Sequence, residues 1–231
     1  KNLRKDKLFQ IGFLIKILLI LFITPNITSN LFLPFLKNSI DIFSLDPWQK
    51  FLLISENVNS FPYGLSMLIA YFPLSYIGNI FDSYIYDINL FEIGFKFSSL
   101  IFDYILFVFI SLLSKNKSPK ILIISYWLSP ILIYSTYIHG QLDIVPITLL
   151  IISVYFLKTN KFYIAGFFIL LSILSKFSML IALPFMFIYI IKRKGISNEF
   201  YKFIISFLIT FVLLLFPYLF SNGFWEMVLS T

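Results

Sequence analysis

The sequence predicts an all-α fold, a polytopic bundle of about seven or eight transmembrane helices, and three observations carry this prediction. Hydrophobic residues make up 59% of the 231 residues, whereas charged residues make up only 13%. A soluble domain is nearer a quarter charged, and a mean hydropathy of +0.92 leaves too little polar surface to cover a globule. The apolar residues also gather in long runs. We therefore expect an integral membrane protein with a single transmembrane domain, residues 1–231.

A transmembrane helix needs about 20 apolar residues, because its backbone amides must be hydrogen-bonded within the segment across about 30 Å of hydrocarbon. The candidate runs are Leu8–Thr24, Phe61–Phe81, Phe97–Leu113, Ile121–Ile138, Ile144–Leu157, Phe162–Ile191 and Phe203–Phe220. The sixth run is too long for one untilted crossing. Lys176 and Ser178 lie near its middle and Pro184 follows, so we expect a break there that gives two short helices.

The distribution of Lys and Arg orients these segments. If every run crosses once and the N-terminal tail is cytoplasmic, the cations are almost equally divided between the two faces. If residues 61–81 instead dip in and return, or lie partly in the interface, and the sixth run is split at Lys176, most cations fall on the cytoplasmic face. We prefer this second topology, which leaves a long first loop, residues 25–60, outside the cytoplasm with 139–143 and Lys176. An eight-helix arrangement with an external tail stays open.

The residue inventory disfavours several classes of function. The net charge of +7 lies in short loops and the N-terminal tail, which is typical of membrane topology rather than of a nucleic-acid groove. The chain has no cysteine and one histidine, which excludes thiolate chemistry and disfavours a multi-histidine zinc site. No GxGxxG, Walker A, GxSxG or HExxH string occurs. No cofactor is firmly implied, and a divalent metal stays open without a ligand cluster to support it.

The first loop carries Asp41 and Asp46, the latter in the string DPWQ at 46–49. An aspartate before Pro47 and Trp48 suggests a turn that caps an amphipathic interfacial helix. Simple solvation explains either aspartate as well as a functional role does. A carboxylate held beside the membrane could also act as general base toward a hydroxyl acceptor.

Other charged side chains fall inside the apolar runs. Lys96 and Asp103 are seven residues apart, so they share a helix face at a separation of about 10 Å. An ionisable group inside a membrane helix is by default functional or paired, and for Asp103 an ion pair with another helix is an equal alternative. Lys16, inside the first run, is expected to snorkel or to be paired. Tyr63, in FPYG at 61–64, marks either a simple helix start or a substrate contact.

The string HGQLD, residues 139–143, is the most informative polar feature because it contains the lone histidine and lies between two apolar runs. Donors from His139 and Gln141 beside the Asp143 carboxylate could hold a sugar or a phosphate. A tight structural turn would look similar. Lys176, in SKFS at 175–178, either snorkels to an interface or offers a cation to a phosphate near the membrane surface.

Five strings of this sequence, in their order along the chain, resemble those of the GT-C superfamily of integral-membrane glycosyltransferases. The resemblance is to its mannosyltransferase-like members in particular, which depend on polyprenyl-phosphate sugars. The strings that carry the resemblance are SIDIFSLDPWQ (39–49), FPYGLSMLIAYFPL (61–74), KFSSLIFD (96–103), LSPILIYSTYIHGQLDIVP (128–146) and LSILSKFSMLIALPF (171–185). The resemblance implies transfer of mannose or another hexose from a polyprenyl- or dolichyl-phosphate donor. The acceptor would be a hydroxyl of a glycan, lipid or protein on the extracytoplasmic or lumenal face.

By position, the resemblance implies that an aspartate of the first loop is the catalytic base, with Asp46 as first choice and Asp41 as second. It also implies that four residues lie near the donor phosphate and sugar: His139, Gln141, Asp143 and Lys176. We add three further candidates for substrate binding: Tyr63, Lys96 and Asp103. Members of this superfamily are generally longer, so we expect the chain to be an N-terminal fragment without the acceptor-binding part. Its membrane would be the plasma or inner membrane of a bacterium, or the ER membrane of a eukaryote.

Two other classes of function use the same polar groups. In a transporter or flippase of lipid-linked saccharides, these side chains would line a pathway and no bond would break. In a non-catalytic subunit of an envelope-assembly complex, they would only hold partners. Internal pseudo-symmetry would favour the transporter and none is evident, whereas carboxylates on a long extracytoplasmic loop favour the enzyme.

Overall fold

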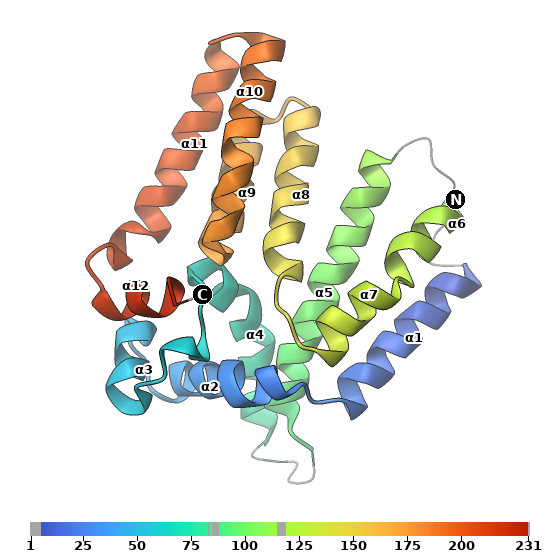
Figure 1. Ribbon diagram of the computed structural model, residues 1–231, viewed down its shortest axis with the longest axis vertical. Helices are drawn as coiled ribbons and strands as arrows, with labels where there is room; N and C mark the ends of the chain where they lie inside the picture. The colour runs from blue at the N-terminus through green and yellow to red at the C-terminus, as the bar shows by residue number, and fades with distance from the viewer. Residues whose placement is uncertain (1–5, 83, 85–87, 115–118, 231) are drawn as a thin grey trace. The chain divides into compact units, whose positions relative to one another are not determined.

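The computed structural model describes residues 6–82, 84, 88–114 and 119–230 (Figure 1). These residues form α-helices joined by short π- and 3-10-helical stretches and turns, and no β-strand occurs among them. The all-α prediction is therefore confirmed for this part of the chain. The chain divides into two compact units: unit 1 comprises Lys1–Pro34 and Tyr71–Ile144, and unit 2 comprises Phe35–Ala70 and Val145–Thr231. Three cations of the expected cytoplasmic tail (Lys1, Arg4, Lys5) and two of the cations expected on the cytoplasmic face at 115–120 (Lys115, Lys117) lie outside the described residues.

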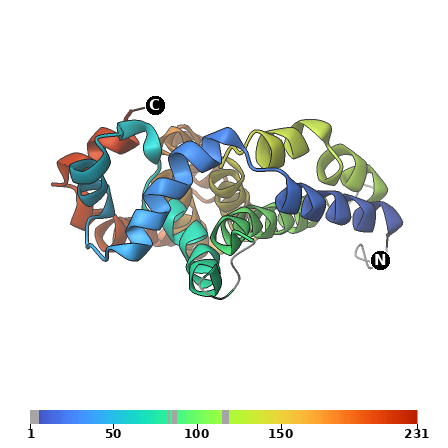
Figure 2. The same cartoon turned by 90° about the horizontal axis from the view of Figure 1, so that it is seen from below.

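Unit 1 is built from apolar helices and a bent helical segment (Figure 2). Its elements are α1 (Lys7–Phe22), η2 (Thr28–Phe32), the second half of α4 (Leu65–Asp82), α5 (Leu90–Leu113), α6 (Pro119–Leu122), η4 (Ile123–Trp127), α7 (Pro130–Ile133) and η5 (Tyr134–Ile138). Asp6 begins α1, because its carboxylate accepts the N–H of Leu8 at 2.9 Å. Pro130 begins α7 after a break at Ser129, since proline is well suited to the first helical position.

The core of unit 1 is aromatic. Phe9 stacks on Trp127 with ring centroids 4.7 Å apart, and Phe107 packs against both rings. The indole N–H of Trp127 donates to the carbonyl of Phe9 at 3.0 Å, so its one polar group is satisfied in the apolar interior. This contact holds α1 against η4.

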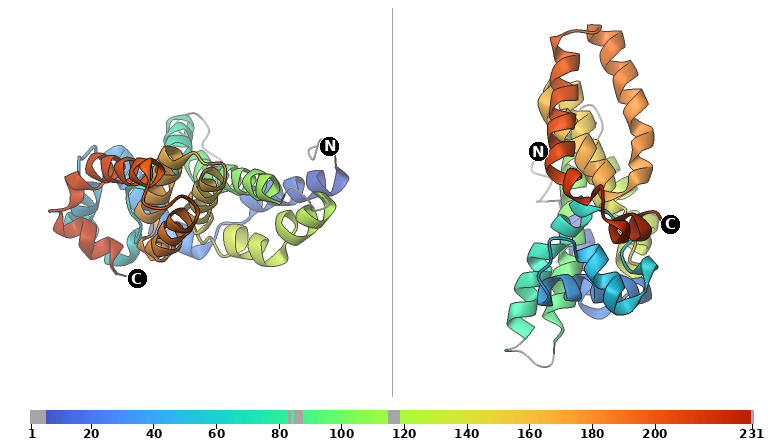
Figure 3. Two further views of the ribbon diagram at one scale, coloured as in Figure 1. Left: turned by 90° about the horizontal axis from the view of Figure 1, so that it is seen from above. Right: turned by 90° about the vertical axis from the view of Figure 1, so that its left-hand side faces the viewer.

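Unit 2 contains the first loop and the C-terminal helices. Its elements are α2 (Leu33–Asp41, from Phe35 onward), α3 (Pro47–Ser55), η3 (Val58–Ser60), the first turns of α4, α8 (Ile144–Lys158), α9 (Phe162–Ser175), η6 (Phe177–Ile181), α10 (Ala182–Lys194), α11 (Asn198–Leu214), η7 (Phe216–Tyr218) and α12 (Asn222–Val228). The helices α9 and α11 pack closely against each other (Figure 3). Gly166 makes this possible, because a Cβ there would overlap the carbonyl of Phe203. Ser206 adds a hydrogen bond to the carbonyl of Tyr163 at 2.6 Å.

The predicted break near Lys176 is present. The helix α9 ends at Ser175, Lys176 has extended backbone angles (φ −150°, ψ 119°), and α10 begins at Ala182. Because α10 turns back from this break, the loop before α9 and the loop after α10 lie at the same end of unit 2 (Figure 1). The two cation groups at 158–161 and 192–202 therefore share one end, as the preferred topology requires.

The expected membrane spans are realised unevenly. By length and composition, α5 is the one described helix that could cross a bilayer by itself, and the bent pair Lys120–Trp127 and Pro130–Ile138, with a 41° bend, could form one further span. The apolar helices α8 and α9 are shorter, at 15 and 14 residues. Within the run 61–81, α4 is one unbroken helix from Leu65 to Asp82 with Pro73 inside it, so the first of the two options, a dip and return within this run, is not what the structure has. Its placement in the interface stays a prediction.

Candidate functional site

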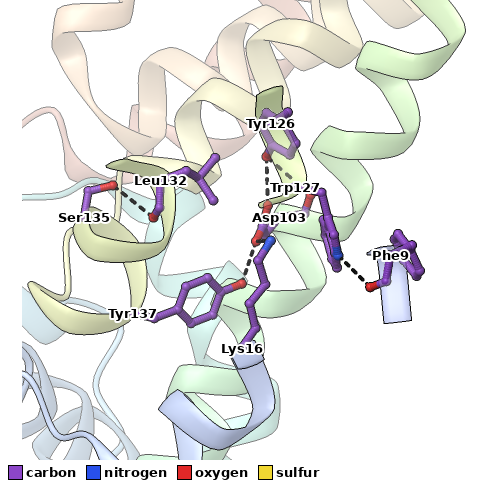
Figure 4. A network of polar contacts seen from close by, with 8 residues as sticks. All are labelled: Phe9, Lys16, Asp103, Tyr126, Trp127, Leu132, Ser135 and Tyr137. Carbon is purple, nitrogen blue, oxygen red and sulfur yellow. Dashed lines mark hydrogen bonds and ion pairs between the residues drawn. The ribbon is translucent and has the colours of Figure 1, made fainter. Parts of the chain in front are cut away.

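Asp103 of unit 1 lies in a buried ion pair (Figure 4). Its Oδ2 is 2.7 Å from the Nζ of Lys16 on α1, and both side chains are 0% exposed. Tyr137 donates to the same oxygen at 2.6 Å, and Tyr126 donates to Oδ1 at 2.8 Å. The ammonium of Lys16 also lies 3.4 Å from the centroid of the Trp127 ring, within the range of a cation–π contact.

These contacts occupy both oxygens of Asp103 with protein donors, so its carboxylate is closed to a substrate. Removing two charges from water is costly, and here the cost is offset by the opposite charge, by two phenols and by an indole face. The geometry therefore favours the interpretation of Asp103 and Lys16 as a structural pair between helices α1 and α5. The tyrosines that complete the pair carry no sequence signal beyond their positions in an apolar segment.

Lys96 anchors the end of α1 to α5. Its ammonium donates to Glu92 at 2.7 Å and to the carbonyl of Ile23, the C-cap of α1, at 3.0 Å. The hydroxyl of Thr24 also donates to Glu92, at 2.5 Å. Lys96 lines a cavity of about 10 Å³, which is room for about one water molecule. Sequence reasoning missed Glu92, although its i,i+4 spacing to Lys96 was a usable signal.

The HGQLD string forms the predicted turn, between η5 and α8. Two backbone bonds close it: His139 N–H to the carbonyl of Tyr134 at 2.8 Å, and Gln141 N–H to the carbonyl of Ser135 at 2.9 Å. Gly140 is buried and has φ +82°. A side chain at this position would be disfavoured both by steric overlap and by backbone strain. The side chains of His139 and Gln141 are exposed, and Asp143 is half-buried. The turn thus presents donors and acceptors on a backbone that is rigidly held.

Asp46 of unit 2 caps the helix α3, as the sequence predicted. Its Oδ1 accepts the N–H of Gln49 at 3.1 Å, and the side chain is half-buried. Among the described residues, no donor bonds to Oδ2. The helix that it caps buries Trp48 and exposes Leu53, at 73%, which gives α3 the amphipathic character expected of an interfacial helix. Asp46 therefore has one oxygen fixed by the cap, while the other accepts no hydrogen bond from the described residues.

Asp41 lies in a different environment at the end of α2. Its carboxylate is 48% exposed and lies 3.8 Å from the ammonium of Lys37, four residues earlier on the same helix. Exposed pairs of this kind contribute little to stability. This solvated position favours Asp46 over Asp41 as the first-loop carboxylate with a built environment.

The chain around Asp46 is held by aromatic packing. Trp48 is fully buried, donates to the carbonyl of Tyr63 at 3.1 Å, and meets the rings of Tyr218 and Phe224 edge-on at 5.2 and 4.9 Å. The side-chain oxygen of Gln49 accepts the N–H of Gly223 at 2.8 Å. The phenol of Tyr218 lies within the electrostatic field of the Asp46 carboxylate, a neighbour that the sequence did not predict.

The FPYG string packs on the helix break at Lys176. Gly64 N–H donates to the carbonyl of Ser175 at 3.3 Å, and a Cβ at Gly64 would overlap the carbonyl of Leu174. Immediately after Lys176, the ring of Phe177 stacks on Trp225 with centroids 5.6 Å apart. Segments 46–49, 61–64, 175–178 and 222–225 thus meet in unit 2, and we call this group of four segments the loop cluster.

The candidate residues are therefore divided between the units. Asp41, Asp46, Tyr63 and Lys176 belong to unit 2, and the last three of them lie in or on the loop cluster. Unit 1 holds the remaining candidates, which are Lys96, Asp103, His139, Gln141 and Asp143.

Within the described ranges, no group of three or more His, Asp or Glu side chains could hold a metal ion. The contribution of residues 216–225 to the loop cluster was missed, because an aromatic stretch near the end of the chain gives no sign of its partner.

Comparison with protein-family models, with curated proteins and with solved structures finds no match for this chain. Function is therefore inferred from the geometry of the residues themselves.

The ion pair in unit 1 predicts a specific pattern of stabilities. Asp103→Asn should lower the free energy of unfolding in detergent micelles by about 3–5 kcal/mol, because it leaves the buried ammonium of Lys16 uncompensated. Adding Lys16→Met should restore much of this loss, since the double variant buries no charge. Asp41→Asn, which breaks an exposed pair, is the control and should cost under about 1 kcal/mol. A stable Asp103→Asn variant would argue against a structural pair.

The contact between Gly64 and the helix break predicts a steric effect. Gly64→Ala should destabilise the protein by about 1–3 kcal/mol, because the added methyl group forces the backbone away from Leu174. The fluorescence of Trp48 and Trp225, on either side of the loop cluster, should change with it. Ser178→Ala, at an exposed position next to the break, should stay within about 0.5 kcal/mol of the parent. Equal stability of the two variants would mean that the Gly64 contact is dispensable.

Proposed function

We propose that the chain is the membrane-embedded part of a glycosyltransferase, with Asp46 as the general base. In this proposal a hexose, mannose or another, moves from a polyprenyl- or dolichyl-phosphate donor to an acceptor hydroxyl on the extracytoplasmic face. The observation that carries it is the environment of Asp46: a half-buried carboxylate with one oxygen anchored by the helix cap, set in a cluster that also includes the helix break at Lys176. A fixed carboxylate with an unoccupied oxygen suits proton abstraction.

Membrane placement is supported by the apolar side chains that the helices leave uncovered. On α1 these include Ile11, Leu14, Leu18 and Leu21, each 44–57% exposed. On α11, a series from Ile205 to Leu213 is 46–68% exposed. A row of exposed apolar side chains along a helix is typical of contact with lipid or with a partner protein. The proposed polytopic bundle would use α5, the bent pair and the shorter helices together.

The proposed reaction is a displacement at the anomeric carbon. Oδ2 of Asp46 takes the proton of the acceptor hydroxyl while the acceptor oxygen forms the new bond to the anomeric carbon. The bond from that carbon to the phosphate oxygen breaks on the opposite side, and its electron pair stays on the lipid phosphate. Attack opposite the leaving group inverts the configuration of the sugar.

Lys176 is proposed to stabilise the departing lipid phosphate. Its backbone leaves α9 in an extended conformation within the loop cluster, so its side chain starts from the same cluster that carries Asp46. A cation placed where negative charge develops lowers the barrier more than it strengthens ground-state binding. His139 and Gln141 belong to unit 1 and stay separate candidates for sugar binding, because their exposed side chains offer donors and acceptors suited to hydroxyl groups.

Asp46→Asn gives the sharpest test of the base. Asparagine caps a helix as well as aspartate does, so the fold should be retained while sugar transfer falls by about 10²–10⁴-fold. The assay is transfer of labelled hexose from polyprenyl-phosphate-hexose to acceptor in membranes that contain the chain. Asp41→Asn is the matched control and should have the milder effect. Full transfer by an Asp46→Asn, Asp41→Asn double variant would remove the assignment and favour a transporter or a non-catalytic subunit.

The proposed sidedness predicts how an introduced cysteine reacts. The chain has no cysteine of its own, so Gln141→Cys places a single thiol at an exposed position of the HGQLD turn. An impermeant thiol reagent should label it in intact cells. Lys192→Cys, on the expected cytoplasmic face, should react only after permeabilisation. The reverse pattern would overturn the topology.

A further inference from the structure

The end of unit 2 opposite the helix break concentrates positive charge. Around the start of α9, the end of α10 and the start of α11 lie six cations: Lys158, Lys161, Lys192, Arg193, Lys194 and Lys202. Three of them, Lys161, Lys194 and Lys202, line one cavity of about 320 Å³ together with Glu199. We call this cavity the basic cavity. Its lining carries three ammonium groups and one carboxylate.

The single carboxylate of the basic cavity is already engaged. Glu199 lies in the first turn of α11 and accepts the hydroxyl of Ser197 at 3.0 Å. Hydrogen bonds from its own backbone N–H and from Ser197 lower its pKa, so it is ionised at neutral pH. Among the described residues, no carboxylate lies within 4.0 Å of the ammonium groups of Lys161, Lys194 or Lys202. The cavity thus keeps an excess of positive charge.

Three helix ends border the basic cavity. The N-terminal ends of α9 and α11 both border the basic cavity, because residues 160–164 line it together with Glu199 and Lys202. Each N-terminus presents unpaired backbone N–H groups and a partial positive charge. The C-terminal end of α10 borders the same cavity at Lys194 and carries the opposite partial charge, so the lysines supply the excess positive charge that makes the cavity complementary to an anion such as a phosphate.

An apolar groove shares the lining residue Tyr163 with the basic cavity. It has a volume of about 480 Å³ and lies between α9, α11 and the start of α4. Tyr163, Phe167 and Leu171 supply one wall at i,i+4 spacing, and Ile209 and Leu213 supply another. We call it the apolar groove. Its walls run for about 12 Å along α9, close to the hydrocarbon depth of one leaflet.

The groove is apolar even where its lining residues carry hydroxyl groups. Ser206 donates to the carbonyl of Tyr163 at 2.6 Å, and Thr210 donates to the carbonyl of Ser206 at 2.8 Å. Both hydroxyls are therefore turned to the backbone. Leu213 is 68% exposed and Phe167 is 40% exposed, so the surface is open to an occupant. Tyr163, 51% exposed, lies at the junction, the position that tyrosine favours at the membrane–water interface.

We propose that the basic cavity and the apolar groove together bind one anionic glycerophospholipid. Its headgroup phosphate lies among Lys161, Lys194 and Lys202, and one acyl chain lies along α9 and α11. A charged cavity and an apolar groove that share the lining residue Tyr163 match an amphipathic ligand in both of its parts. The preferred topology places this end in the cytoplasmic leaflet, whose anionic lipids attract clustered lysines. The inference rests on membrane placement, but it involves none of the residues proposed for sugar transfer.

The test titrates the purified full chain, in uncharged detergent, with phosphatidylglycerol or with phosphatidylcholine of the same acyl chains. Thermal unfolding reports binding, because a ligand of the folded state raises the melting temperature. Phosphatidylglycerol should raise it more than phosphatidylcholine does. In the Lys161→Gln, Lys194→Gln, Lys202→Gln variant, the apparent affinity for phosphatidylglycerol should fall at least about tenfold. The control variant Lys7→Gln, Lys37→Gln, Lys120→Gln has the same net charge and should keep the parent's affinity.

Two further arms identify the part of the ligand that is bound. Inorganic phosphate alone should give little shift, whereas a shift equal to that of phosphatidylglycerol would mean that the site takes a free anion and would overturn the lipid proposal. Ile209→Trp, which fills the groove and leaves every lysine in place, should weaken phosphatidylglycerol binding even if the triple lysine variant fails to fold. Equal stabilisation by both lipids, or retention of the shift in Ile209→Trp, would also overturn it. The lipid titration and the sugar-transfer assay vary different residues. Failure of the lipid proposal therefore leaves the transfer assay with Asp46→Asn unchanged, and the two proposals can fail separately.

Discussion

The candidate site depends on one close backbone contact, that of Gly64 with the carbonyls of Leu174 and Ser175. A helix break exposes carbonyl groups that an apolar environment cannot satisfy. At Ser175 this need is met by the N–H of Gly64, and only a residue without a side chain approaches so closely. The same contact brings the first loop to the break, since the carbonyl of neighbouring Tyr63 is bonded to Trp48. The segment 222–225 makes a second link between them, through the Gly223–Gln49 hydrogen bond and the stack of Phe177 on Trp225.

The two units use polar residues in opposite ways. In unit 1, Lys16 and Asp103 are surrounded by donors and aromatic faces, so the cluster is satisfied and buried. In unit 2, Asp46 uses one oxygen for the cap and keeps the other unbonded among the described residues. A satisfied network stabilises and specifies a fold, whereas a partly satisfied and half-exposed carboxylate has capacity left for chemistry. This difference, more than the number of charged groups, separates structural from candidate catalytic residues here.

The ends of unit 2 also differ in character. The loop cluster carries a capped aspartate and buried aromatic rings, whereas the other end carries lysines and two helix N-termini. Helices α9 and α11 share one direction, so both present their positive ends to the basic cavity. The carboxylate proposed as the base and the cationic cavity therefore lie at opposite ends of unit 2.

The helical class, the cap at Asp46, the break at Lys176 and the turn at HGQLD could all be predicted from the amino-acid sequence. Each of these depends on local chemistry: apolar runs, an aspartate before proline, a lysine within an apolar segment, and a glycine between polar residues. Which charges are paired, and which segments meet, became known only from the folded chain. The partners of Asp103 come from residues 16, 126 and 137, and the loop cluster joins segments separated by more than a hundred residues. Such pairings are set by long-range packing, which leaves no periodicity or spacing in the chain to predict them.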